Sequence, residues 1–269
     1  MAIIHPLAIV HPGAKLAADV EVGPYCFIDD NVEIGEGCKI LPNATIFPYV
    51  KMGRDCSVFP GAVIGAIPQD LKFEGEVSRV EIGDRVTIRE CATINRGTAA
   101  SGKGVTRVGD DTLLMSYVHV AHDCNIGKHC ILVSYVGVAG ETDIDDWAIL
   151  GGGTKVHQFT KIGAHAMVGG GTTVIKDVPP YSLCGRVPMV FVGVNLVGLR
   201  RRNFSSETIR TIKDIYDLLY YQGLNFSDAL TRIELGFPES EERDAILKFV
   251  SGSKRGIVRA GDARDKSFE

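Results

Sequence analysis

The sequence lacks an excess of positive charge, a long apolar run and a large set of aromatic residues. Its 269 residues carry 29 Lys and Arg against 33 Asp and Glu, so the net charge is −4. That balance argues against a nucleic-acid binder that relies on overall positive charge. The best candidate for a membrane span, residues 189–199, is bracketed by arginines and falls short of the roughly 20 residues that a span needs. We therefore expect no nucleic-acid partner and no membrane span.

Targeting and disulfide signals are missing as well. The first residues, MAIIHP, lack the basic start and apolar core of a signal peptide. We therefore expect a cytoplasmic protein, in which seven cysteines without a CxxC pair are reduced thiols. The hydrophobic share of 45% and charged share of 23% are typical of a globular chain. No Gly-rich dinucleotide or phosphate motif is present, so no cofactor is expected.

An aliphatic residue recurs every six positions through two thirds of the chain, and we call each six-residue unit a hexad. This period is wrong for an α-helix and too long for one strand, but it fits a short strand followed by a bend. Three hexads, one for each side, close a triangular coil. Five cysteines occupy the small inward position of the repeat, where we expect them to be packing residues: Cys26, Cys38, Cys56, Cys124 and Cys130.

By resemblance to hexapeptide-repeat proteins, the repeat predicts an all-β, left-handed parallel β-helix over residues 1–185. Two polar segments break the repeat, at 66–79 and 97–107, and should loop out of the prism. From Ser205 the pattern becomes helical, with that serine or the next as the N-cap. The sequence predicts a small C-terminal α-helical domain over 186–269 that covers the last coil.

Stacking of one coil of three hexads on the next places His122, at an outward position, directly beside Gly140. An exposed imidazole beside a free backbone N–H is suited to acyl transfer, because the imidazole removes a proton from a hydroxyl and the N–H stabilises the oxyanion. Asp123 adjoins the histidine and could orient it. The simpler alternative is that His122 is an ordinary surface histidine.

Three further patterns are open to two interpretations. A zinc site of His119, His122 and His157 is disfavoured, because the stacking puts the last one about 10 Å along the axis by strand spacing; no metal is expected. The glycines of 150–154 and 168–172 stack into either a groove for an acyl chain or a set of turns. The arginines at 200–202 either clamp phosphates or form a solvated basic run.

Together these residues resemble the acyl-carrier-protein–UDP-N-acetylglucosamine O-acyltransferases, over residues 1 to about 260. The matching strings are IPQDLKF (67–73), INRGT (94–98), VAHDC (120–124), VHQF (156–159), KDVPPY (176–181) and GVNLVGLRRR (193–202). The resemblance implies a homotrimer with active sites in clefts between subunits. It implies transfer of an (R)-3-hydroxyacyl group from acyl carrier protein to the 3-hydroxyl of UDP-N-acetylglucosamine, the first step of lipid A biosynthesis.

The resemblance also implies roles for individual residues. His122 matches the general base, Asp123 its orienting carboxylate and Gly140 the oxyanion donor. Gly170 matches the position that limits acyl length. Sugar, pocket and nucleotide contacts are implied for Gln69, Asp70, Lys72, His119, His157, Gln158, Asn195, Arg201 and Arg202.

Two positions depart from the family pattern. Glu141 stands where a histidine is common, which puts the sugar contact there in doubt, and Val197 replaces a frequent glutamate. The sequence also leaves open the acyl length and a 3-hydroxy or 3-amino acceptor. One alternative is the sister UDP-3-O-acyl-glucosamine N-acyltransferase, whose extra N-terminal domain has no room before Ile4; another is a non-catalytic β-helix scaffold. The chain runs through nearly three coils between Asp70 and His122, so we expect that one chain does not bring them together.

Overall fold

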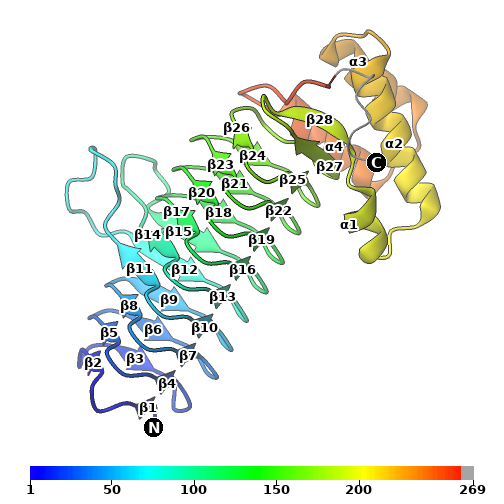
Figure 1. Ribbon diagram of the computed structural model, residues 1–269. Coiled ribbons are helices and arrows are strands. Elements are labelled where there is room, and N and C mark those ends of the chain that lie inside the picture. Colours follow the sequence, from blue (N-terminus) through cyan, green and yellow to red (C-terminus); the bar gives the residue numbers. More distant parts are fainter. Residues whose placement is uncertain (262–269) are drawn as a thin grey trace.

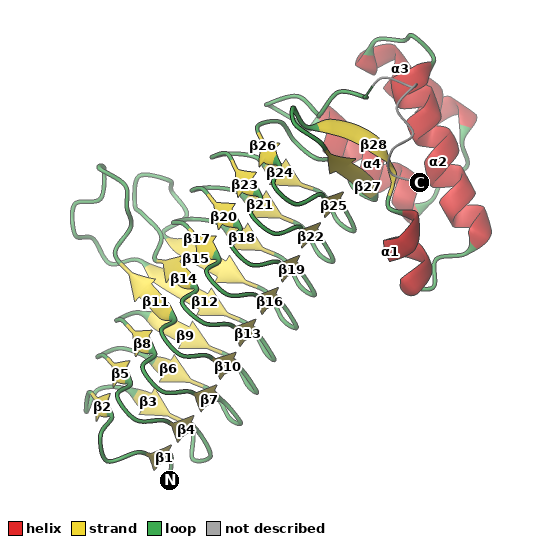
Figure 2. Ribbon diagram, in the orientation of Figure 1, coloured by secondary structure: helices red, strands yellow, loops and turns green. Residues whose placement is uncertain are grey.

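The computed structural model describes residues 1–261, which form a long three-sided prism with helices at its C-terminal end (Figures 1 and 2). Each coil adds one short parallel strand to each of three sheets. Paired strands are three hexads apart where no insertion intervenes, so Ile131 pairs with Ile149 and Ile149 with Met167. The molecule is a left-handed parallel β-helix with a small helical part, which confirms the predicted fold class.

The three sheets are called A, B and C in the order in which the chain visits them. Sheet A consists of β1 (Ile3–Ile4), β4 (Glu21–Val22), β7 (Lys39–Ile40), β10 (Ser57–Val58), β13 (Thr87–Ile88), β16 (Leu113–Leu114), β19 (Ile131–Leu132), β22 (Ile149–Leu150), β25 (Met167–Val168), β27 (Ser182–Gly185) and β28 (Val190–Val194). Sheet B consists of β2 (Ile9–Val10), β5 (Phe27–Ile28), β8 (Thr45–Ile46), β11 (Val63–Ala66), β14 (Thr93–Asn95), β17 (His119–Val120), β20 (Gly137–Val138), β23 (Lys155–Val156) and β26 (Thr173–Val174). Sheet C consists of β3 (Lys15–Leu16), β6 (Glu33–Ile34), β9 (Val50–Met52), β12 (Arg79–Ile82), β15 (Val105–Val108), β18 (Asn125–Ile126), β21 (Asp143–Ile144) and β24 (Lys161–Ile162).

The core of the prism is the stacked aliphatic position of the repeat. These side chains are almost all buried from the second coil upward, and the five inward cysteines are buried beside them, as predicted. Cys184 is also buried, because β27 pairs with β25 and places it beside Val168 in the aliphatic column. Cys91 instead takes a left-handed turn conformation, with φ of 57°, and is half-buried. The repeat pattern alone did not explain the positions of Cys91 and Cys184.

The turns between the sheets form three edges of the prism, which we call corners AB, BC and CA. From Tyr25 to Gly171, one residue in each regular turn has a positive φ. On corner BC they include Asp123, Glu141 and Phe159, with φ of 58°, 56° and 64°. A left-handed non-glycine residue is unfavourable by about 1–2 kcal/mol, so the stacked strands impose this conformation.

Both predicted insertions interrupt corner BC. The first runs from the end of β11 to the start of β12, and the second from the end of β14 to the start of β15. In Figure 1 the two loops project from the prism next to one another. They are also bonded to each other, because the Glu76 carboxylate accepts the N–H of Ala99 at 2.8 Å. The inserted residues therefore gather along one edge of the molecule.

The C-terminal part begins with a hairpin, since β28 pairs antiparallel with β27. Its helices are α1 (Leu196–Arg201), α2 (Ser206–Tyr221), α3 (Phe226–Gly236) and α4 (Glu241–Ser251). Ser205 caps α2 as predicted, accepting the N–H of Thr208 at 3.0 Å. The hairpin and α1 were not predicted, and residues 262–269 of the predicted domain lie outside the described part. In residues 1–261 no helix is long and apolar enough to cross a membrane.

Candidate active site

A histidine and an aspartate stand together in the turn between β17 and β18, on corner BC. His122 Nδ1 lies 2.9 Å from Asp123 Oδ2. The His122 side chain is 10% exposed and the Asp123 carboxylate is completely buried. A buried carboxylate that accepts from Nδ1 fixes the tautomer in which Nδ1 carries the proton and Nε2 is a free base. His122 stands in the outward turn between two strands, but the expectation of an exposed imidazole is wrong, because its side chain is buried.

Gly140 lies one coil above His122, as the stacking of hexads predicts. The Glu141 N–H donates to the His122 carbonyl at 3.0 Å, which fixes the two turns against each other. A Cβ atom at Gly140 would collide with the His122 imidazole, so only glycine allows this approach. Within residues 1–261 the Gly140 N–H has no hydrogen-bond acceptor. The site thus pairs a base with an unused backbone donor.

Asp70 lies in the same site, which overturns the expectation that one chain cannot bring it to His122. Its Oδ2 is 3.7 Å from His122 Nε2. The count of nearly three coils between Asp70 and His122 was wrong, because the inserted residues add to the sequence separation without adding a coil. Val63, at the base of the first insertion, pairs with Thr93, and Thr93 with His119, so the two turns are two coils apart. The inserted loop spans the remaining gap.

Two residues of INRGT that sequence analysis left without a role hold the Asp70 loop in place. Asn95 Nδ2 donates to the carbonyl of Ile67 at 2.7 Å. The guanidinium of the buried Arg96 lies 5.8 Å from the centroid of the Phe73 ring. The backbone N–H of Arg96 bonds to the first insertion as well. Burial lowers the pKa of Arg96. Their position in the sequence could have indicated this role, since they stand between the end of a hexad and the second insertion.

The remaining pocket residues predicted by resemblance differ from one another in burial and in hydrogen bonding. His119 Nδ1 bonds to Thr93 Oγ1 at 2.7 Å, and burial followed by the charge of His122 lowers the pKa of His119. His157, two coils higher, is exposed and bonds through Nδ1 to the Gln158 carbonyl at 3.0 Å. Gln69 and Lys72 are exposed on the first insertion, and the Lys72 N–H bonds to Asp70 Oδ1 at 3.0 Å.

The three residues predicted to contact a nucleotide lie in α1 (Arg201) or at its ends (Asn195 and Arg202), and the two end residues bond to corner CA, away from His122. Arg202 donates to the carbonyl of Trp147 at 2.9 Å and lies over its ring, while Arg201 is exposed. Asn195 is 7% exposed and both ends of its amide are occupied. Its oxygen caps α1, and its nitrogen donates to the His165 carbonyl at 2.9 Å. The structure therefore does not bring this group together with His122 in one chain.

Gly170 lies on the third edge, corner AB. It stacks on Gly152 as predicted, because the Gly171 N–H bonds to the Gly152 carbonyl at 2.8 Å. The left-handed turn position belongs to Gly171, with φ of 69°, and not to Gly170. A Cβ at Gly170 would lie 3.0 Å from the Gly152 carbonyl oxygen. The turn therefore does not require a positive φ at Gly170, but a side chain there would press against the backbone of Gly152.

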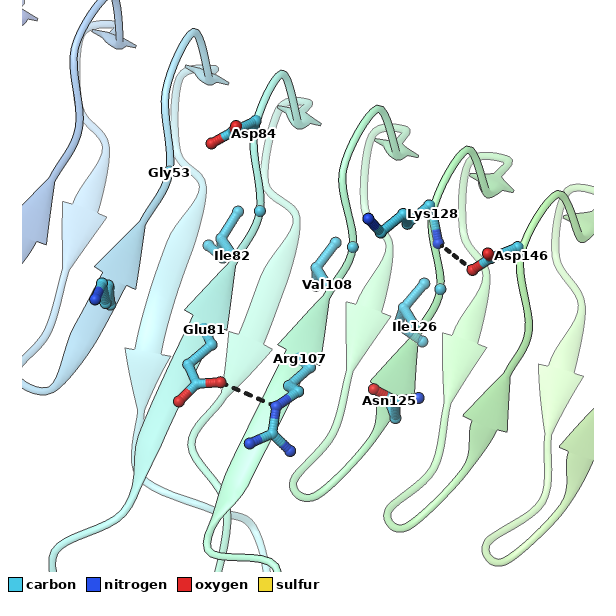
Figure 3. A pocket seen from close by; sticks show the side chains of 14 residues that line it. Gly53, Glu81, Ile82, Asp84, Arg107, Val108, Asn125, Ile126, Lys128 and Asp146 are labelled. Atoms are coloured by element: carbon cyan, nitrogen blue, oxygen red, sulfur yellow. Dashed lines mark hydrogen bonds and ion pairs between the residues drawn. The ribbon is translucent and has the colours of Figure 1, made fainter.

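A trough of about 590 Å³ runs along sheet C and the adjoining turns (Figure 3). Within it, the Arg107 guanidinium donates to the Glu81 carboxylate at 2.9 Å. The backbone N–H of Lys128 bonds to Asp146 at 2.7 Å. The trough contains none of the predicted site residues. Among residues 1–261, no group of three His, Cys, Asp or Glu side chains could hold a metal ion.

A prism of six-residue repeats that places a histidine beside a free backbone N–H is the architecture of a hexapeptide-repeat transferase. Comparison with known families agrees. The model of the bacterial transferase hexapeptide matches residues 13–48 and 106–140. The model described as UDP N-acetylglucosamine O-acyltransferase, domain 2, matches residues 177–258.

Relatives match along nearly the whole chain. An acyl-[acyl-carrier-protein]–UDP-N-acetylglucosamine O-acyltransferase of Sulfurihydrogenibium is 50% identical over 98% of this chain and 97% of its own. Its counterpart in Thermodesulfovibrio yellowstonii is 41% identical over 95% and 99%. The UDP-N-acetylglucosamine acyltransferase structure from Bacteroides fragilis is 50% identical, covers 96% of this chain and 100% of its own, and superimposes with a TM-score of 0.93.

The chain belongs to the acyl-[acyl-carrier-protein]–UDP-N-acetylglucosamine O-acyltransferase family, and it is an enzyme. The resemblance stated from its motifs is confirmed. The alternative of a non-catalytic scaffold is wrong.

The pKa of His165, at the helical end of the prism, predicts that the stability of the fold depends on pH. Burial, and then the charge of Arg202, lowers the pKa of His165 to about 4, against about 6.5 for an unfolded histidine. Between these values only the unfolded chain binds the proton, so we expect stability to fall as the pH drops from about 6.5 towards 4. Urea unfolding across this range would measure the loss. A His165→Asn variant should lose this component, and an unchanged pH dependence in that variant would contradict the assignment.

Proposed function

We propose that the enzyme transfers an (R)-3-hydroxyacyl group from acyl carrier protein to the 3-hydroxyl of UDP-N-acetylglucosamine, the first step of lipid A biosynthesis. The names of the full-length relatives support the donor, the acceptor and the class of reaction. The observation that carries the mechanism is the stacked pair of His122 and Gly140, because it supplies a base and an oxyanion donor one coil apart.

His122 acts as the general base. The Asp123 carboxylate accepts a hydrogen bond from Nδ1–H, so Nε2 is left to accept the proton of the sugar 3-hydroxyl. The hydroxyl oxygen then attacks the thioester carbonyl, and the positive charge that forms on the imidazole is balanced by the buried Asp123 carboxylate. This arrangement needs no metal or other cofactor for the proton transfer.

Gly140 stabilises the intermediate. As the carbonyl carbon becomes tetrahedral, its oxygen gains negative charge and accepts the free Gly140 N–H. The intermediate collapses when the carbon–sulfur bond breaks, and His122 returns its proton to the departing thiolate. The products are the ester and the free thiol of the carrier protein, so the proton and the acyl group are both accounted for.

Neighbouring polar side chains bind the acceptor sugar. Asp70 Oδ2 stands 3.7 Å from the reactive nitrogen, within reach of a hydroxyl held between them. Gln69 and Lys72 lie on the same exposed loop. His119 adds a neutral imidazole, because its pKa is lowered. Above them, Gly140 is followed along corner BC by Gln158 and its neighbour His157, which complete the acyl and sugar pocket.

The functional enzyme is a homotrimer whose sites are shared between subunits. Two observations support this. The proposed nucleotide contacts lie in α1 or at its ends, where Asn195 and Arg202 bond to corner CA, whereas His122 lies on corner BC of the same chain. The outward residues of sheet A in the upper coils form a half-buried apolar stripe, which a neighbouring subunit would cover: Leu113, Ile131, Ile149 and Met167.

A His122→Ala substitution should lower turnover about 10²- to 10⁴-fold, the usual contribution of a general base. The fold should persist, because the side chain fills no part of the prism core. Steady-state kinetics with an acyl-carrier-protein donor would measure the loss, with circular dichroism as the control for folding. Exhaustive chelation should leave the wild-type rate unchanged. Near-normal turnover in the variant would remove His122 from the mechanism.

Mixed trimers distinguish contacts within a chain from contacts across the interface. Subunits carrying His122→Ala and Arg201→Ala should recover activity together, because one site of a mixed trimer receives both intact residues. Subunits carrying His122→Ala and Asp70→Asn should not recover, because both changes fall in the same site of the same chain. Co-expression with two affinity tags and activity assays would test this. Recovery by the second pair alone would contradict the shared-site arrangement.

Gly170 limits the length of the acyl chain. Gly170→Met should disfavour long donors about 10- to 100-fold, because room for two to four methylenes at about 0.8 kcal/mol each is lost. Turnover on short and long hydroxyacyl donors measures this selectivity. Gly171→Ala is the matched control, since it strains a left-handed turn with no nearby atoms and should lower only the melting temperature. An equal loss of turnover for all donors in Gly170→Met would show that Gly170 has only a structural role.

A further inference from the structure

The second insertion wraps the buried aspartate of the active site. The Thr98 N–H lies 2.9 Å from Asp123 Oδ1 and 3.0 Å from Oδ2. The Thr98 hydroxyl lies 2.8 Å from Oδ2, the same oxygen that contacts His122. Thr98 is 1% exposed and Asp123 is completely buried. One residue therefore contacts both oxygens of the carboxylate.

The direction of the Thr98 hydroxyl is fixed by its own neighbours. The Ser101 N–H donates to Thr98 Oγ1 at 3.3 Å, which occupies a lone pair of that oxygen. A carboxylate oxygen only accepts when ionised, so the hydroxyl proton points to Asp123. The donor is thus held in place before any substrate arrives.

The rest of the insertion closes around the backbone of the aspartate. The Asp123 N–H donates to Thr106 Oγ1 at 2.8 Å, and Lys103 Nζ donates to the Asp123 carbonyl at 3.2 Å. A Cβ at Gly97 would collide with the backbone of the returning strand and with Asp123 Oδ1. The chain therefore passes the carboxylate at a distance that only glycine permits. Backbone and side chain of Asp123 are both fixed by this one segment.

We propose that Thr98 is a positioning residue for the acyl transfer, acting through Asp123 on His122. A buried carboxylate is costly unless its lone pairs are used. His122 supplies one donor and Thr98 the others, so rotation of the carboxylate would break the Thr98 contacts and the histidine contact together. Thr98 thereby keeps the imidazole in the orientation in which Nε2 faces Asp70 and Gly140. The inference rests on the proposed role of His122 as the base.

The test removes the hydroxyl and keeps the size of the side chain. Thr98→Val retains the backbone N–H bond and loses the bond to Oδ2. We expect kcat to fall about 10- to 100-fold, as for other groups that orient a catalytic side chain, while KM for both substrates stays unchanged. Thr98→Ser restores a hydroxyl at the same place and should regain most of the rate.

Thr112→Val is the matched control for the loss of a buried hydroxyl. Thr112 is also 1% exposed, donates to the Gly127 carbonyl at 2.9 Å and accepts the Cys130 N–H at 3.1 Å, all outside the site. It should lower the melting temperature and leave kcat unchanged. If Thr98→Val does not fold, Thr98→Ala removes the same hydroxyl without adding a methyl group, and its kcat and KM give the same test.

A double-mutant cycle separates positioning from a general structural effect. In a His122→Ala background, Thr98→Val should cost nothing further, because the group that it orients is gone. An additive loss, a wild-type rate in Thr98→Val, or an effect on KM alone would each overturn the proposal. Its failure is distinct from failure of the proposed function: near-normal turnover in His122→Ala alone would refute the base, whereas an inactive His122→Ala with a fully active Thr98→Val refutes only the positioning.

Discussion

The pairing of each coil with the next, at a fixed offset of three hexads wherever the repeat is unbroken, is the constraint on which the structure depends. Because parallel strands stack about 4.8 Å apart, every side chain has a neighbour of known sequence position above and below it. The same ladder that buries the aliphatic core sets Gly140 against His122 and Gly170 against Gly152. The packing of the core and the geometry of the proposed active site therefore depend on the same strand register, and a shift in that register would disrupt both.

The insertions act where the repeat cannot. A regular corner offers only short turns, and a turn has few donors for a buried carboxylate. The second insertion supplies them through Thr98, while the first brings Asp70 to within 3.7 Å of His122 Nε2. The bond from Ala99 to Glu76 joins the loops, and it lowers the pKa of that glutamate. The two breaks in the repeat thus enclose one candidate site, on the corner where His122 stands.

The other two corners serve different ends. Corner CA carries stacked rings, with His129 and Trp147 4.0 Å apart, and leads to the helical end through Arg202. Corner AB carries the stacked glycines, which leave this edge without side chains at two successive turns, 151–153 and 169–171. Since a site built from all three corners cannot form around one straight prism, the proposed trimer is what allows these edges to meet.

The sequence by itself determined the repeat, the prism, the inward cysteines, the two insertions and the stacking of Gly140 on His122, because a period of six leaves little freedom. It also indicated Asp123. Only the tertiary structure decided that Asp70 reaches His122, that Asn195 is a buried helix cap and that Thr98 holds the aspartate. These contacts join an irregular loop, or a chain end, to the regular prism, and no periodicity encodes where such a segment turns back. Their partners are chosen by burial and by the need to satisfy buried polar groups, which a count along the chain does not contain.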